Sequence, residues 1–228
     1  MLTIFTALAR HATATPETIA LRGSNAILNY SRLPHEIDRA SQMIERHCPG
    51  TGPVALCLDN SPAWALLDLA LLRSGRICVP VPTFFTPQQR ENALRQSGAS
   101  HVIEDDPLGG DAQLAGAALT FRPHNTAPVA LPQGTAKIPF TSGSTGTPKG
   151  VCLSRAMMEE TAAAIVASVG RDHGSLHCAL LPLAVLLENV AGLYAVLMAG
   201  CTYGVPAPAE LGLANPFLPD FARLTTAL

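Results

Sequence analysis

The sequence predicts an α/β fold in which layered parallel or mixed sheets are covered by helices. Three observations support this prediction. Short apolar, strand-like runs alternate with helical stretches, the connections are short and rich in Pro and Gly, and neither an internal repeat nor a charge block interrupts the alternation. The 228 residues suffice for one large domain or two small ones with a sizeable core.

The first elements follow from hydrophobic spacing and capping signals. Ile4, Leu8 and His11 recur at helical spacing, which predicts a helix over residues 4–14. Ser31 is the expected N-cap of a second, amphipathic helix. The strands expected in this part of the chain are 18–22, 26–30 and 54–58.

The helix expected next starts at Pro62 and is apolar nearly all round, so we expect it and its Trp64 to be buried. Another helix opens at Thr86 and ends near residue 97. The expected strands here are 76–81 and 101–104. The pattern weakens over residues 105–133, where we expect a variable connection with one strand near Leu119.

The alternation resumes further along the chain. The expected strands are 151–153, 177–181 and 201–205, and the expected helices are 154–169, with Ser154 as its cap, and 187–199. We therefore divide the chain into a first α/β subdomain, residues 1–133, and an incomplete second one, residues 134–228, which begins just before a glycine-rich loop.

Composition narrows the functional classes. A hydrophobic content of 48%, a charged content of 14% and a net charge of -2 predict neither a nucleic-acid partner nor an acidic membrane surface. The six cysteines stand singly and the histidines show no ligand spacing, so we expect a cytoplasmic protein with reduced thiols and no metal site. Residues 178–205 are apolar enough to span a bilayer, but Glu188 lies in their middle; two strands around a buried helix fit better, and a membrane span is the alternative.

The stretch 140–151, FTSGSTGTPKGV, has the composition of an anion-binding loop. Its glycines let backbone N–H groups converge, its hydroxyls add donors, and Lys149 adds a positive charge, a set that suits the phosphates of a nucleotide. The stretch is not a Walker loop, because Pro148 precedes the lysine and Gly150 follows it. The alternative is a flexible Gly/Ser/Thr linker.

Four motifs give the chain a resemblance to the adenylate-forming (AMP-binding) enzymes, which include acyl-CoA synthetases and the adenylation domains of peptide synthetases. Residues 141–150 match every position of the family's T-S-G-[ST]-T-G-x-P-K-G. The runs 28–33, 54–64 and 72–81 are similar to its L-T-Y-x-E-L, VAL-x-x-x-NSPEW and L-R-x-G-A-x-x-V-P-L motifs. The resemblance implies the N-terminal part of the family's large α/β domain.

The family couples a carboxylic acid to ATP as an acyl-AMP, releases pyrophosphate, and usually passes the acyl group to coenzyme A. The resemblance therefore implies a carboxylic acid substrate together with ATP, Mg²⁺ and coenzyme A. Carried over by position, Lys149 and Thr145 are the expected catalytic residues. The residues expected to hold the ATP phosphates are Thr141, Ser142, Gly143, Ser144, Thr145, Gly146, Thr147, Lys149 and Gly150.

Residues 181–192, LPLAVLLENVAG, resemble the L-P-L-[SA]-H-x-x-E-x-x-x-G segment of the fatty acyl-CoA synthetase branch, which lies near the acyl site. Val185 stands where those relatives usually carry histidine, and Glu188 keeps their acid, so both are candidate residues of the substrate pocket. The alternatives are a core role for Val185 and a structural role for Glu188. An acid among leucines must be paired or lie at a pocket edge.

Several parts of the family pattern find no match downstream of Gly150: the Y-G-x-T-E segment with its magnesium-binding glutamate, the ribose-binding aspartate, and the C-terminal domain with its catalytic lysine. We therefore expect the N-terminal fragment of an ATP-dependent acid–thiol ligase, inactive by itself. The alternatives are a non-catalytic nucleotide-binding or scaffold module of a truncated or split protein, and a peptide-synthetase adenylation domain. Exposed apolar surface predicts a homodimer, and residues 142–147 are expected to be weakly ordered without nucleotide.

Overall fold

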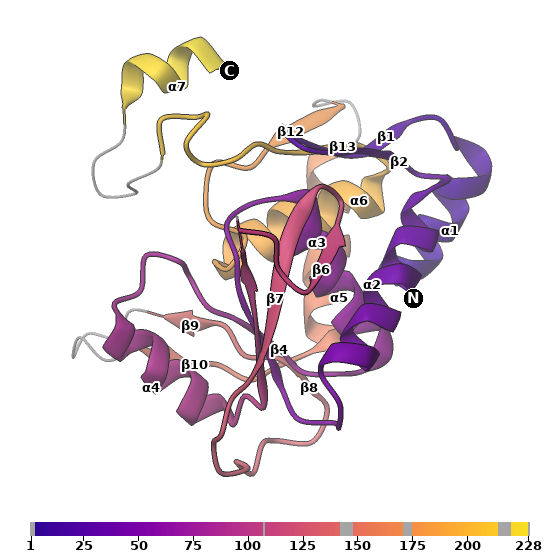
Figure 1. Cartoon of the computed structure of the whole chain (residues 1–228). Coiled ribbons are helices and arrows are strands. Elements are labelled where there is room, and N and C mark those ends of the chain that lie inside the picture. The colour runs from indigo at the N-terminus through magenta and orange to yellow at the C-terminus, as the bar shows by residue number, and fades with distance from the viewer. Residues whose placement is uncertain (1–2, 107, 142–147, 171–174, 214–219, 228) are drawn as a thin grey trace.

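The computed structural model describes residues 3–106, 108–141, 148–170, 175–213 and 220–227 (Figure 1). Strands and helices alternate along most of the chain, and the α/β class predicted from the sequence is confirmed. The helices are α1 (Ile4–Ala14), α2 (Leu33–His47), α3 (Pro62–Ser74), α4 (Pro87–Ser97), α5 (Arg155–Val169), the π-helix η1 (Leu187–Tyr194), α6 (Ala195–Ala199) and α7 (Phe221–Ala227).

A mixed seven-stranded sheet has the order β11-β8-β4-β3-β5-β7-β6. Its strands are β3 (Val54–Cys57), β4 (Cys78–Pro80), β5 (His101–Asp105), β6 (Ala112–Leu114), β7 (Ala117–Pro123), β8 (Thr135–Lys137) and β11 (Leu153–Ser154). β8, β4, β3 and β5 run parallel, whereas β7, β6 and β11 pair antiparallel with their neighbours. The carboxyl ends of the four parallel strands therefore lie at one edge of the sheet.

Side chains alternate across this sheet and fill two cores. Leu56 and Ile103 belong to the larger core with α2 and α3, while Ala55 and Val102 belong to a smaller core with Ala93 of α4. Figure 1 shows α4 on the left of the sheet and α2 on its right. The helix predicted to be buried is α3, whose apolar residues, Trp64 included, are all buried.

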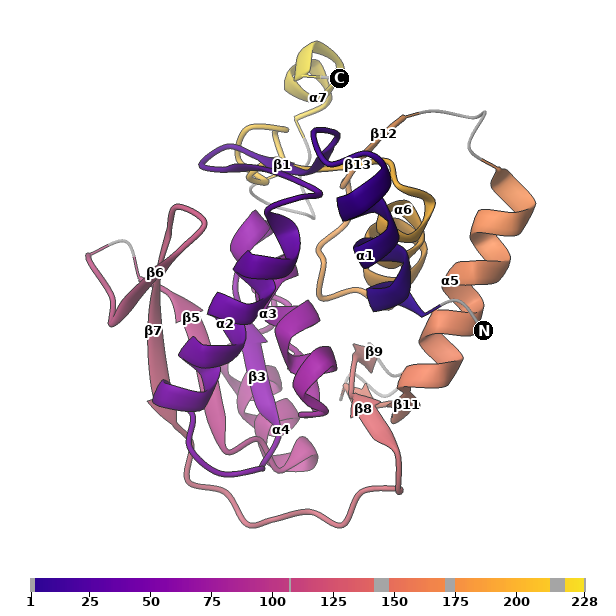
Figure 2. The same ribbon diagram turned by 90° about the vertical axis from the view of Figure 1, so that its right-hand side faces the viewer.

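A four-stranded sheet has the order β12-β13-β1-β2, with β1 (Ile19–Gly23), β2 (Ile27–Asn29), β12 (Leu176–Cys178) and β13 (Thr202–Val205). β1 runs parallel to β13, and β13 runs parallel to β12. In Figure 2 this sheet lies at the top, with α1 and α6 below it. The β1–β13 and β4–β8 pairings cross the boundary drawn after residue 133, and the division into subdomains stays a prediction.

Helix boundaries agree with the sequence, but one predicted cap is wrong. Ser154 Oγ accepts a hydrogen bond from the Met157 N–H at 3.2 Å, which confirms it as the cap of α5. Ser31 does not cap α2, because its hydroxyl donates to Asn29 Oδ1 at 3.0 Å. That same amide oxygen accepts from the Arg32 N–H at 3.1 Å, so Asn29 orders the turn before the helix.

Three other expectations need correction. The strand expected near Leu119 is β7, but residues 105–133 also contain a second strand, β6, which pairs with β7 as a hairpin. The strand expected at 151–153 is replaced by two short ones, β10 (Lys149–Gly150) and β11. The helix at 187–199 begins as η1 and continues as α6. No helix within the described ranges is long and apolar enough to cross a membrane.

Candidate functional site

The glycine-rich loop is closed by a two-stranded ribbon. β9 (Phe140–Thr141) pairs antiparallel with β10, so that Thr141 lies opposite Lys149 and Phe140 lies opposite Gly150. The side chains of Thr141 and Lys149 are exposed. The ribbon therefore presents a hydroxyl and an ammonium group together at the two ends of the loop.

The residues between these ends lie outside the described ranges. They are Ser142, Gly143, Ser144, Thr145, Gly146 and Thr147. Their expected contacts with ATP phosphates, the catalytic role of Thr145 and the expected weak order of this segment therefore stay predictions.

The ribbon is anchored by backbone hydrogen bonds and by one glycine. The Ile138 N–H donates to the Cys78 carbonyl at 2.9 Å, and the Val151 N–H donates to the Pro139 carbonyl at 3.0 Å. A Cβ at Gly150 would lie 2.9 Å from Ile138 Cγ2, so a side chain there would push the ribbon off the smaller core. Because β8 runs parallel to β4, the chain leaves β8 for the loop at the carboxyl edge of the sheet.

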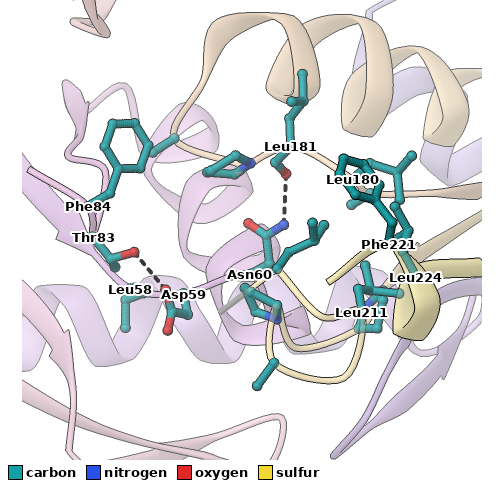
Figure 3. Close-up of a pocket in the computed structure, with 17 residues that line it drawn as sticks. Leu58, Asp59, Asn60, Thr83, Phe84, Leu180, Leu181, Leu211, Phe221 and Leu224 are labelled. Atoms are coloured by element: carbon teal, nitrogen blue, oxygen red, sulfur yellow. Dashed lines mark hydrogen bonds between the residues drawn. The ribbon is translucent and has the colours of Figure 1, made fainter. Parts of the chain in front are cut away.

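A cavity of about 360 Å³ lies where strands of both sheets end. Its walls come from the residues that follow β3, β4, β12 and β13, together with α7. Figure 3 shows Phe84 on one side of it and Phe221 on the other, with Leu180 and Leu211 on the same side as Phe221. The walls are mostly apolar, so the cavity suits a ligand or a chain segment with an apolar body.

Asn60 holds one wall of this cavity in place. Its Nδ2 donates to the Leu181 carbonyl at 2.8 Å, and its Oδ1 accepts from the Leu183 N–H at 2.7 Å. The asparagine of the N-S-P motif thus fixes the start of the L-P-L segment, although 121 residues separate Asn60 from Leu181. Both motifs contribute to the family resemblance, but the sequence did not predict this contact between them, because no local pattern encodes it.

Two acids, Asp59 and Asp105, lie near the carboxyl edge of the seven-stranded sheet. Thr83 Oγ1 donates to Asp59 Oδ1 at 2.7 Å, and Asp105 Oδ2 accepts from the Asp59 N–H at 2.9 Å. Burial raises the pKa of Asp105; the hydrogen bond from the Asp59 backbone opposes this rise, and the charge of Asp59 adds to it. Both carboxylates are engaged in fixing the turns after β3 and β5.

Glu188 is buried, with 5% of its surface exposed, and it is fully partnered. Its Oε1 lies 2.8 Å from His177 Nε2 and accepts from the Tyr203 hydroxyl at 2.9 Å, while Oε2 accepts from the Leu181 N–H at 3.3 Å. Burial, and then the charge of Glu188, raise the pKa of Tyr203, so this phenol remains a donor. The expectation that an acid among leucines must be paired is confirmed.

Neither Glu188 nor Val185 lines the 360 Å³ cavity; Ala184 does. Val185 is half-buried, and its N–H donates to the Pro182 carbonyl at 2.8 Å. Next to it, Leu186 and Leu187 line a separate apolar groove of about 330 Å³ against α5. The assignment of Val185 and Glu188 to a substrate pocket stays a prediction.

Comparison with known proteins identifies the family. Residues 8–224 match the AMP-binding enzyme family, and the chain belongs to it. This confirms the superfamily expected from the loop at 141–150.

Among curated relatives, the nonribosomal peptide synthetase verP of Clonostachys rogersoniana is 28% identical over 222 residues, which cover 89% of this chain and 11% of that protein. Pyochelin synthetase PchF of Pseudomonas aeruginosa is 29% identical over 210 residues, covering 89% and 12%. The chain thus spans about a tenth of these relatives, which are peptide synthetases rather than acyl-CoA synthetases.

Solved structures share the fold. The N-terminal subdomain of Klebsiella oxytoca NpsA, in complex with 3-hydroxyanthranilyl-AMSN, superposes with a TM-score of 0.74 at 21% identity, covering 99% of this chain and 57% of that one. O-succinylbenzoate coenzyme A synthetase (MenE) of Bacillus subtilis, in complex with ATP and magnesium ion, gives 0.68 at 20% identity, covering 87% and 56%. The architecture is therefore that of the N-terminal subdomain of adenylate-forming enzymes.

Proposed function

We propose that this chain supplies the phosphate-binding side of the nucleotide site of a carboxylate-activating, adenylate-forming enzyme. The observation that carries the proposal is the β9–β10 ribbon, which places exposed Thr141 opposite exposed Lys149 at the two ends of the loop. A cation and a hydroxyl held together at a solvent-facing edge suit the triphosphate of ATP.

The proposed reaction follows from the chemistry of phosphoryl groups. A carboxylate oxygen of the acid attacks the α-phosphorus of ATP, the bond from that phosphorus to the bridging oxygen breaks, and pyrophosphate leaves with the electron pair. Negative charge therefore grows on the leaving group, and the Lys149 ammonium together with the hydroxyls and N–H groups of residues 141–147 would stabilise it.

Magnesium enters this proposal only together with ATP. Within the described ranges, no group of His, Cys, Asp and Glu residues is arranged to hold a metal ion. The residues proposed to meet the nucleotide are hydroxyl, glycine and lysine residues, whose donors suit phosphate oxygens. We therefore assign no metal ligand among the residues that the structure describes.

For the acid and its acceptor, we favour a peptide-synthetase type of adenylation domain, in which the activated acid passes to a protein-bound thiol. The relatives verP and PchF support this assignment, because each covers 89% of the chain. The second candidate is an acid–coenzyme A ligase acting on an apolar acid. The resemblance at 181–192 and the apolar walls around Phe84 and Phe221 favour it.

The phosphate assignment is tested by footprinting the amino group of Lys149. Acetylation of the chain is followed by mass spectrometry with and without ATP or pyrophosphate. Protection of Lys149 by either compound is expected, with adenosine as the matched control that lacks phosphates. Equal acetylation under all conditions would refute the phosphate assignment.

The two acid classes are separated by stable acyl-adenylate analogues. Calorimetry would compare an aminoacyl-sulfamoyl adenosine with a decanoyl-sulfamoyl adenosine on the same preparation. Tighter binding of the aminoacyl compound is expected, and tighter binding of the decanoyl compound would select the second candidate. The chain by itself is expected to give no carboxylate-dependent ATP–pyrophosphate exchange, because the family's Y-G-x-T-E segment and its ribose-binding aspartate have no match in it.

A further inference from the structure

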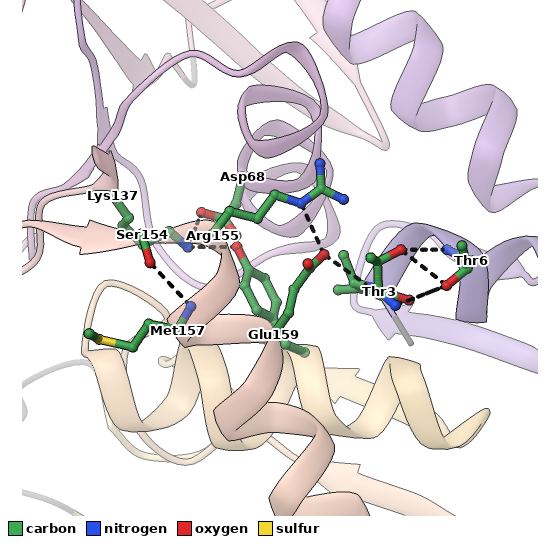
Figure 4. Close-up of polar contacts among 10 residues, drawn as sticks. Thr3, Thr6, Asp68, Lys137, Ser154, Arg155, Met157 and Glu159 are labelled. Atoms are coloured by element: carbon green, nitrogen blue, oxygen red, sulfur yellow. Dashed lines mark hydrogen bonds and ion pairs between the residues drawn. The ribbon is translucent and has the colours of Figure 1, made fainter. Parts of the chain in front are cut away.

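The chain contains two lysines, and the one that the proposed function leaves unused is buried. Lys137 has 1% of its side chain exposed, and Asp68 of α3 has none exposed. The Lys137 Nζ and Asp68 Oδ1 atoms form an ion pair at 2.6 Å. Figure 4 shows the two side chains facing one another beside Ser154, the residue that caps α5.

Every donor of the buried ammonium group has a partner. Besides Asp68, it donates to the Tyr194 hydroxyl at 2.8 Å and to Asn189 Oδ1 in a short hydrogen bond. Asp68 Oδ2 accepts from the Tyr194 hydroxyl at 2.7 Å and from Asn189 Nδ2 at 3.2 Å. These four residues, which we call the Lys137 network, form a closed set in which each side chain contacts at least two others.

Burial raises the pKa of Tyr194 well above its usual range, and the negative charge of Asp68 adds to the rise. The phenol therefore stays neutral and continues to donate to the carboxylate.

Stability alone does not account for such a network. Removing an Asp and a Lys from water costs free energy, and well-packed apolar residues of similar volume often stabilise a fold equally well or better. A fully satisfied polar network differs from an apolar contact in being directional, since it is intact in only one relative arrangement of its elements. Here those elements are α3, β8 and η1.

Lys137 also occupies a particular place in the sheet. It is the last residue of β8, paired with Cys78 of β4 on one side and with Leu153 of β11 on the other. β8 leads into the ribbon through Ile138 and Pro139, and β11 follows the ribbon. One limb of the phosphate loop therefore starts just after Lys137, and the other leads into β11, whose Leu153 pairs with Lys137.

We propose that Lys137 is a positioning residue for the phosphate loop: its ammonium group, held by Asp68, Asn189 and Tyr194, fixes both limbs of the ribbon relative to α3 and η1. This inference rests on the proposed phosphate-binding function of the loop. The network acts on the nucleotide only through the ribbon, and η1, which carries Glu188, thereby becomes coupled to the loop.

The test uses the double variant Lys137→Met with Asp68→Leu, because a single replacement leaves a buried charge without its partner and destabilises the fold for an unrelated reason. Ile44→Ala, which truncates a buried side chain of α2, is the matched control for a general loosening of the fold. Two quantities are measured: amide hydrogen exchange at Ile138 and Val151, with Val54 as the reference amide, and the ATP concentration that half-protects Lys149 from acetylation.

In the double variant, exchange at Ile138 and Val151 and the protecting ATP concentration should each rise about tenfold, within the range that coupling networks show. Exchange at Val54 should change little, and Ile44→Ala should leave the loop signals near those of the parent chain. Parent-like values for both signals in the double variant would overturn the proposal. If ATP fails to protect Lys149 in the parent chain, the phosphate function itself fails, whereas the exchange at Ile138 and Val151 still decides the positioning role.

Discussion

The two lysines stand on either side of the phosphate loop in opposite surroundings. Lys137 is buried with three polar partners, and Lys149 is exposed at the other end of the loop. Buried and partnered, Lys137 has no donor left for a ligand, whereas the ammonium group of Lys149 faces solvent. A positive charge near a loop therefore marks a ligand site only when its hydrogen-bond donors remain available.

Amine reactivity should show this contrast most strongly. Lys149 is expected to react readily with an acetylating reagent, because its side chain is exposed. Lys137 should react only when the sheet opens, at least about a hundredfold more slowly. Mass spectrometry of the digested, time-quenched chain measures both rates in one sample. Similar rates would contradict the burial of Lys137.

Alanine substitution should lower the stability of the protein much more at Lys137 than at Lys149. Lys137→Ala leaves Asp68 as an unpaired buried charge, so the free energy of unfolding should fall by about 3–5 kcal/mol. Lys149→Ala removes an exposed side chain and should change it by less than about 0.5 kcal/mol. Urea denaturation measures the free energy of unfolding of both variants. A similar loss of stability in the two would contradict the contrast between the buried and the exposed lysine.

Nucleotide affinity should depend directly on the exposed lysine. Lys149→Ala should weaken ATP binding about tenfold, because it removes a charge-assisted hydrogen bond to phosphate. Lys149→Arg, which keeps the charge, is the control and should retain most of the affinity. Calorimetric titration of the chain with ATP measures both, and an unchanged affinity in Lys149→Ala would exclude this lysine from the site.

Within the Lys137 network, a smaller loss of stability than that of Lys137→Ala is expected from Tyr194→Phe, which removes one hydroxyl and should cost about 1 kcal/mol at pH 7. The folded-state pKa of Tyr194 is raised above the unfolded value near 10, so the stabilisation that it provides is complete below pH 10 and is lost as the pH rises further. The stability gap between the parent chain and Tyr194→Phe should therefore narrow above pH 10. Unfolding measured from pH 7 to 11 checks the trend, and a constant gap would contradict it.

Local signals in the sequence predicted much of the fold. The helix over residues 4–14, the Ser154 cap and the buried helix with Trp64 are all present, because each depends on neighbouring residues alone. Residues 105–133 were expected to hold one strand near Leu119, and the second strand of the hairpin was missed because glycines at 109, 110 and 116, all with positive φ, make its surroundings look like a loop. The Ser31 cap was wrong because Asn29, two residues away, competes for the same hydroxyl and backbone groups.

The candidate site was predictable only in part, for a related reason. The loop was recognised because its ten-residue pattern is contiguous. Asp68 and Lys137 lie 69 residues apart, and Asn60 contacts a segment 121 residues away, so no periodicity or spacing reveals these partners. The assignment to the acyl-CoA synthetase branch rested on one segment, residues 181–192, and the curated relatives favour peptide synthetases instead.

The π-helical form of η1 has a consequence for how the sequence tolerates change in length. Two consecutive residues on it serve different sheets: Glu188 meets Tyr203 of the four-stranded sheet, and Asn189 meets Lys137 of the seven-stranded one. Successive side chains point about 100° apart on an α-helix and somewhat less on the wider π-helix, so deleting a single residue from this segment would turn one of the two away from its sheet. The number of residues between Leu187 and Tyr194 is therefore as constrained as their identity, and a family member one residue shorter here would need a different junction between its sheets.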